Sequence, residues 1–121
     1  MTVRLVHVVD DDPRVRETLV WMLEAVGFAV EAHVGPGSVP AHSGDCVILD
    51  ECLGDRSSGL DAVDPGTGRL AKHPVVLLTG FAHKPETQRR AAAVGVRHVL
   101  GKPTQIRHLM EAVEAAMSEA S

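Results

Sequence analysis

Short runs of consecutive apolar residues recur along the chain, and polar residues follow each of them. Four runs are plain, at residues 5–9, 46–49, 75–78 and 96–100, and residues 28–34 alternate loosely between apolar and polar. Short unbroken apolar runs are typical of strands that are buried on both faces of a sheet. Because segments with helical spacing separate these runs, the pattern predicts an α/β fold with five parallel strands.

Three of the connecting segments have clear helical patterns. Residues 13–26 carry apolar side chains at helical spacing and follow Asp12, which can cap the first turn. Residues 85–94 stop at a glycine, and residues 106–116 again show helical spacing. These segments are predicted to cover the sheet, with right-handed crossovers between its strands.

The second and third connections are interrupted. Glycines and prolines at residues 35–40 leave room for only a stub, and Pro65 with its neighbouring glycines breaks the pattern within residues 60–71. We therefore expect the second and third helices to be shortened or irregular.

Composition limits the function. The chain has 121 residues with 45% apolar content, which predicts a single domain over residues 1–121. Its 12 lysines and arginines against 16 aspartates and glutamates give a net charge of −4, so no direct nucleic-acid contact is expected. No stretch approaches the roughly 20 apolar residues that span a bilayer. Since the start also lacks a signal-peptide pattern, a cytoplasmic location without membrane contact is expected.

Polar residues at the predicted strand ends carry the chemistry. Asp10 and Asp11 follow the run at residues 5–9, Asp50 follows the run at 46–49, and Thr79 follows the run at 75–78. Lys102 comes just after the run at 96–100. The carboxyl ends of parallel strands share one sheet edge, where open α/β folds bind ligands, so these side chains should converge. Clustered carboxylates favour a hard divalent cation such as Mg²⁺.

An ionised Asp50 beside such a cation is a usable nucleophile toward phosphorus. The Thr79 hydroxyl could bind one phosphoryl oxygen, and the Lys102 ammonium could neutralise another.

The motifs resemble those of the receiver domain of two-component response regulators, along essentially the whole chain. The residues that carry the resemblance are Val8-Val9-Asp10-Asp11-Asp12-Pro13, Val47-Ile48-Leu49-Asp50, Leu77-Leu78-Thr79-Gly80, Gly95 and Gly101-Lys102-Pro103. The resemblance implies a flavodoxin-like, doubly wound sheet with strand order 2-1-3-4-5.

The resemblance also implies roles for the site. Asp50 would accept a phosphoryl group from a histidine kinase or phosphotransfer protein, without the domain being an enzyme in the usual sense. Asp11 and Asp50 would bind Mg²⁺ directly, Asp10 through water, and Cys52 through its backbone carbonyl. Thr79 and Lys102 would be the switch hydroxyl and the phosphate-binding lysine.

Several positions depart from the family pattern. Gly54 stands where a proline is usual, and Gly59 comes one residue late, so the loop after the acceptor is longer. Val99 occupies the usual position of a switch aromatic. Cys52 and Phe81 place apolar groups at two positions that flank the acceptor, which predicts a long-lived phosphorylated state.

The sequence leaves two alternative functions open. A phosphorylation-independent pseudo-receiver that acts as an interaction module would fit the broken middle helices. A phosphatase of the haloacid-dehalogenase type expects an aspartate where Cys52 stands.

The seven histidines show no metal-ligand spacing and favour surface or packing roles, with His7 buried in the first strand. A cationic face formed by residues 85–118 could bind an output partner or a second copy of the chain.

Overall fold

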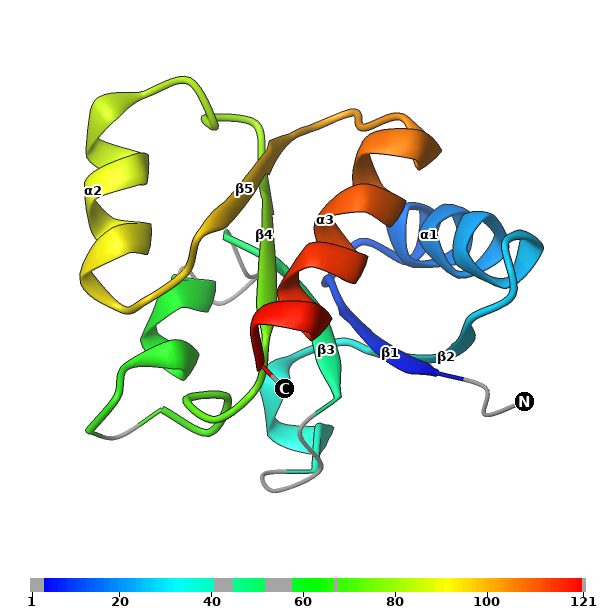
Figure 1. The fold of residues 1–121 in the computed structure, drawn as a ribbon, viewed down its shortest axis with the longest axis horizontal. Coiled ribbons are helices and arrows are strands. Elements are labelled where there is room, and N and C mark those ends of the chain that lie inside the picture. The colour runs from blue at the N-terminus through cyan, green and yellow to red at the C-terminus, as the bar shows by residue number, and fades with distance from the viewer. Residues whose placement is uncertain (1–3, 41–44, 52–57, 67, 121) are drawn as a thin grey trace.

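A computed structural model describes residues 4–40, 45–51, 58–66 and 68–120. Its centre is a parallel five-stranded sheet with the order β2-β1-β3-β4-β5, which confirms the predicted fold class and strand order (Figure 1). The strands are β1 (Leu5–Val9), β2 (Ala29–His33), β3 (Cys46–Asp50), β4 (Val75–Thr79) and β5 (His98–Gly101).

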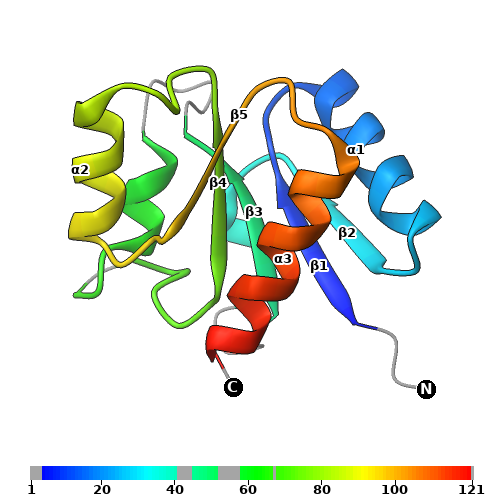
Figure 2. The same cartoon turned by 45° about the horizontal axis from the view of Figure 1, so that its top comes forward.

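Helices cover both faces of this sheet, as Figure 2 shows. On one face, α1 (Pro13–Ala25) and α3 (Ile106–Ala120) pack over Val6, Val8 and other residues of the inner strands. On the other face lie α2 (Pro85–Ala93) and the 3-10 segments η1 (Pro36–Ser38) and η2 (Gly59–Val63). The two short segments η1 and η2 confirm the prediction that the second and third helices are shortened.

Alternation along β1 sorts its side chains between the two faces. Val6 and Val8 enter the core beneath α1 and α3, and Val9 enters the opposite core. Side chains two residues apart in a strand share a face. His7 therefore points to the same face as Val9, where it is fully buried.

The last strand starts later than the apolar run predicts, at His98 rather than at residue 96. Gly95 has a φ of +83°, and the amide of Val96 donates to the carbonyl of Ala91 at the end of α2. Because this helix-ending turn uses the Val96 amide, the strand cannot begin there. Val96 is nevertheless buried in the core.

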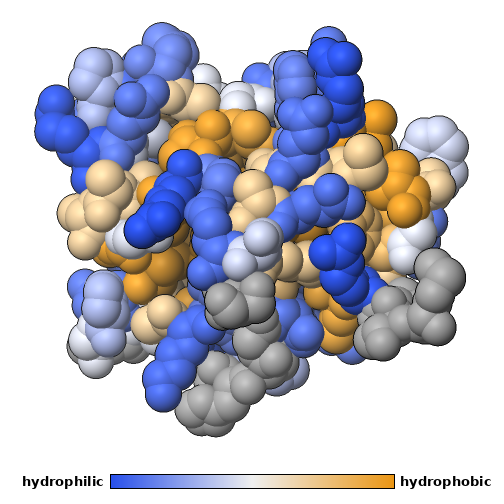
Figure 3. Space-filling view, in the orientation of Figure 1, coloured by the Kyte–Doolittle hydropathy of each residue, from blue (hydrophilic) through white to orange (hydrophobic). Residues whose placement is uncertain are grey.

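Polar side chains stand out over much of the surface, with apolar surface visible between them on the face shown in Figure 3. Trp21, off the apolar stripe of α1, is exposed. Within the described ranges, every helix is too short or too polar to cross a bilayer.

Candidate functional site

Three carboxylates meet at the carboxyl edge of the sheet. Asp10 directly follows β1, and Asp50 is the last residue of the neighbouring strand β3. Asp10, Asp11 and Asp50 each place a carboxylate oxygen within 4.8 Å of the other two. Asp10 and Asp50 are buried and Asp11 is exposed, so the group opens to solvent on one side.

Lys102 lies against two of these carboxylates. Its Nζ is 2.9 Å from Asp50 Oδ1 and 3.2 Å from Asp10 Oδ2. Burial alone would lower the pKa of the Lys102 ammonium, but the hydrogen bond and charge of Asp50, and then those of Asp10, outweigh it and raise that pKa. Lys102 is therefore a cation beside Asp50 at neutral pH.

Hydrogen bonds of the loop after β1 fix the orientation of Asp10. Its Oδ1 accepts from the Asp12 amide at 2.9 Å, and its backbone carbonyl accepts from the Arg16 guanidinium at 2.7 Å. Asp12 in turn accepts from the Arg14 amide at 2.9 Å, which confirms it as the cap of α1. The first turn of the helix thus holds the loop that presents Asp10 and Asp11.

This donor set fits Mg²⁺. It offers carboxylate oxygens only, from two strand ends, and the exposed Asp11 leaves room for the waters that Mg²⁺ retains. The backbone carbonyl of Cys52, the fourth predicted ligand, lies outside the described residues. The structure thus brings together three of the four predicted metal ligands, with Lys102 beside them.

Thr79 ends the adjacent strand β4, and its hydroxyl has two partners. Oγ1 donates to Glu51 Oε1 at 2.9 Å and accepts from the Phe81 amide at 3.0 Å. The amide of Lys102 donates to the Thr79 carbonyl at 3.0 Å, so the ends of β4 and β5 are joined. The single proton of the Thr79 hydroxyl is therefore used in the hydrogen bond to Glu51.

Glu51 was not among the residues predicted from the sequence. Its side chain is only 5% exposed, and its Oε2 has no hydrogen-bond partner within the described part of the chain. A buried carboxylate oxygen without a partner is costly. A glutamate that follows a strand-end aspartate gives no sequence signal of this kind, because loop glutamates are usually solvated.

Gly59 lies where the loop after Asp50 returns to the sheet. Its amide donates to the Glu51 carbonyl at 2.6 Å, and a Cβ at this position would collide with the backbone carbonyl of Asp50. The late glycine noted in the sequence therefore has a steric cause. It allows the returning chain to pass against the end of β3.

Gly59→Ala should lower the free energy of unfolding by about 1–3 kcal/mol, because the added methyl group must displace backbone rather than a flexible side chain. Urea unfolding would measure this loss. Gly37→Ala is the matched control, since a Cβ there meets no atom within 4 Å. Equal stability of the two variants would contradict the close packing at Gly59.

Comparisons with known proteins show the family of this chain. A family model described as the response regulator receiver domain matches residues 6–114. The transcriptional regulatory protein FixJ of Azorhizobium caulinodans is 31% identical over 121 residues, which cover 96% of this chain and 56% of FixJ. The chain spans about half the length of the curated relatives it matches.

Solved structures share the fold. A CheY-like receiver domain protein from Methanospirillum hungatei JF-1 has a TM-score of 0.82 at 20% identity, covering 98% of this chain and 97% of its own. A response regulator from Burkholderia pseudomallei, solved with a phosphorylated aspartic acid, calcium ion and citrate, has a TM-score of 0.79 at 24% identity. That match covers 96% of this chain and 69% of the other. With residues 6–114 matched by the family model, this chain belongs to the response regulator receiver domains of two-component signalling.

Proposed function

We propose that Asp50 accepts a phosphoryl group, in a Mg²⁺-dependent reaction, from a histidine kinase or phosphotransfer protein. The observation that carries the proposal is the meeting of Asp10, Asp11, Asp50 and Lys102 at one edge of the sheet. Asp10, Asp11 and Asp50 would hold the cation, which when bound supplies positive charge to the transferring phosphoryl group.

The chain's own groups account for the remaining chemistry. An Asp50 carboxylate oxygen forms the new bond to phosphorus as the bond to the donor's imidazole nitrogen breaks, and the nitrogen leaves with the electron pair. Lys102, already 2.9 Å from Asp50, stabilises the added negative charge. No proton has to leave Asp50, because the nucleophile is the ionised carboxylate.

The switch in this proposal is the Thr79 hydroxyl. To donate to a phosphoryl oxygen on Asp50, Oγ1 must give up its bond to Glu51. Hydrogen bonds to charged groups contribute about 1.5–3 kcal/mol. Glu51 therefore stabilises the unphosphorylated arrangement and opposes the active one.

Glu51→Gln should raise the affinity for fluoroberyllate, a phosphoryl mimic, by about fivefold in the presence of Mg²⁺. Replacing a charged acceptor by a neutral one weakens the bond to Thr79 by about 1 kcal/mol, which lowers the cost of releasing the hydroxyl. Titration followed by Trp21 fluorescence or by NMR would measure the change.

The same substitution in a Thr79→Val background distinguishes the two ways in which Glu51 could act. Without the hydroxyl, Glu51→Gln should have little effect, because the hydrogen bond is already gone. If the fivefold gain persists without the hydroxyl, Glu51 acts through its charge alone and the proposed competition for Thr79 is wrong.

Propagation of the switch must differ from the usual aromatic rotation. Val99, at the position expected for the aromatic, is half-buried against the core that contains Val9, Leu77 and Ala91. The movement would therefore pass through the segment 80–84 and α2.

The face formed by residues 85–118 would bind the output partner or a second copy of the chain. Arg89, Arg90 and Arg107 are exposed there.

The aspartyl phosphate should decay slowly. Phe81 is apolar and partly exposed beside Thr79, at a position from which a polar side chain could orient an attacking water. After removal of the phosphodonor, Phe81→Asn should therefore lose its phosphoryl group faster than the native chain. A native half-life of seconds would contradict this account.

Intact mass measured after incubation with acetyl phosphate and Mg²⁺ tests the proposal. We expect one phosphoryl group per chain, and none when a chelator removes Mg²⁺. An unmodified mass together with an unchanged spectrum on addition of fluoroberyllate would instead favour the pseudo-receiver that acts only as an interaction module.

A further inference from the structure

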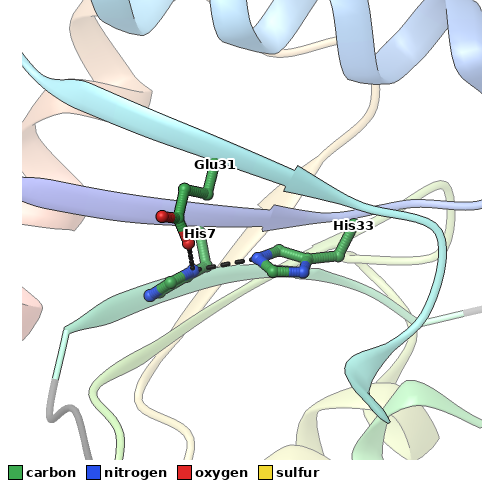
Figure 4. A group of neighbouring side chains, drawn as sticks. All are labelled: His7, Glu31 and His33. Carbon is green, nitrogen blue, oxygen red and sulfur yellow. Dashed lines mark hydrogen bonds and ion pairs between the residues drawn. The ribbon is translucent and has the colours of Figure 1, made fainter. Parts of the chain in front are cut away.

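A second cluster of ligand-type side chains lies on the sheet, apart from the acidic group. His7 comes from β1, and Glu31 and His33 come from the edge strand β2 (Figure 4). Parallel pairing places His7 opposite Glu31, and His33 is two residues further on the same face. Although 26 positions separate the histidines in the sequence, their rings lie side by side.

We propose that His7, Glu31 and His33 form a zinc site, with His7 Nδ1, His33 Nε2 and a Glu31 carboxylate oxygen as ligands. Two imidazoles and one carboxylate are a ligand set that suits zinc and leaves its fourth position open. This proposal is independent of phosphoryl transfer to Asp50.

The distances fit one small ion. His7 Nδ1 is 2.9 Å from His33 Nε2 and 3.4 Å from Glu31 Oε2. Ligand atoms about 2.0–2.1 Å from a tetrahedral zinc lie about 3.3–3.4 Å from one another. The three atoms therefore need to move apart only slightly to admit the ion.

The other nitrogen of each imidazole already has a partner. His7 Nε2 lies 3.3 Å from Asp45 Oδ2, and His33 Nδ1 lies 2.6 Å from Ser38 Oγ. Such contacts fix the ring orientation and the tautomer in zinc sites. The carbonyl of Asp45 is in turn 2.8 Å from His73 Nδ1, so a third buried histidine supports this arrangement.

Zinc binding requires a lone pair on both facing nitrogens. The tautomer of His7 that donates from Nε2 to Asp45 Oδ2 leaves such a lone pair on Nδ1. When the proton of His33 moves to Nδ1 and is donated to Ser38 Oγ, both facing nitrogens offer a lone pair.

Access comes from the Glu31 side. The Glu31 side chain is 55% exposed on the edge strand, whereas that of His7 is fully buried. A metal could therefore enter past Glu31, with water in the fourth position. The carboxylate-only group at Asp10, Asp11 and Asp50 instead favours Mg²⁺, so the two sites would select different ions.

Calorimetric titration of the tag-free chain with Zn²⁺, in excess Mg²⁺, tests the proposal. We expect one zinc per chain, and binding weakened by at least about 100-fold in Glu31→Ala and in His33→Gln. Asp45→Asn should cost about tenfold as a positioning residue. Glu24→Ala and His108→Gln, at exposed positions elsewhere, are the matched controls and should bind as the native chain does.

Cobalt substitution adds a readout that does not depend on affinity. Co²⁺ should give the visible absorption of a four-coordinate site in the native chain, and Glu31→Ala should lose it. Since Glu31 is exposed, this variant can be checked by unfolding to be as stable as Glu24→Ala. Absence of zinc binding, zinc binding unchanged in both ligand variants, or zinc binding lost in Asp50→Asn would each overturn the proposal.

Discussion

Asp50→Asn is expected to abolish phosphoryl transfer while leaving the fold intact. The side-chain amide of asparagine is a poor nucleophile toward phosphorus. Among the described carboxylates, only Asp10 also lies at a strand end in direct contact with Lys102. Asp10 differs in that its Oδ1 also accepts from the Asp12 amide, and we propose it as a metal ligand rather than as the acceptor. Intact mass after incubation with acetyl phosphate and Mg²⁺ would show no added phosphoryl group.

The fold should survive this change for an electrostatic reason. Asp50 lies within 4.8 Å of two other carboxylates, so removing its charge relieves repulsion even though one contact with Lys102 is weakened. Asp61→Asn, on the exposed side of η2, is the matched control and should be phosphorylated as the native chain is. Phosphorylation of Asp50→Asn at native levels would mean that the acceptor lies elsewhere.

Lys102→Ala should cause the largest loss of stability among single changes at the site, about 2–3 kcal/mol in the absence of Mg²⁺. Its removal takes away the ammonium that contacts both buried carboxylates, Asp10 and Asp50, and losing one partner of a fully buried ion pair costs about 3–5 kcal/mol. The Lys102 side chain is 28% exposed, and solvent screening reduces that figure. Because its pKa is raised, this contribution is fully present at neutral pH and is lost only as the pH rises through that raised value.

Mg²⁺ should restore much of this loss. A cation bound by the folded state alone raises its stability, and without Lys102 the carboxylates no longer have a competing positive charge. Thermal unfolding with and without Mg²⁺ would therefore show a larger increase in Lys102→Ala than in the native chain. Lys72→Ala, an exposed lysine, is the control. If Lys72→Ala loses as much stability as Lys102→Ala, the Lys102 ammonium does not stabilise the group formed by Asp10, Asp11 and Asp50.

The strands and the acidic site could be predicted from the sequence because each rests on a local signal. Unbroken apolar runs mark strands that are buried on both faces, and the polar residue after each run marks the same sheet edge. The convergence of Asp10, Asp50 and Lys102 then follows from parallel pairing alone. The sequence places the start of β5 too early, because Val96 is apolar and buried although its amide is used by the turn that ends α2.

Glu51 and the histidine cluster could not be predicted in the same way. The role of Glu51 depends on the path of its loop, which turns an acid after a strand inward to Thr79. His7, Glu31 and His33 meet only through the register of β1 against β2, which the weak alternation in residues 28–34 does not fix. Aligning the first two strands in parallel and looking for metal-ligand residues that face each other could have identified this cluster.

Chemical mapping of the modified residue tests the central claim most directly. Borohydride reduces an aspartyl phosphate to homoserine, so peptide sequencing by mass spectrometry reads the acceptor position itself. After incubation with acetyl phosphate we predict homoserine at residue 50 alone, and only when Mg²⁺ is present. Aspartate remaining at residue 50 under these conditions, or homoserine at another position, would contradict the account.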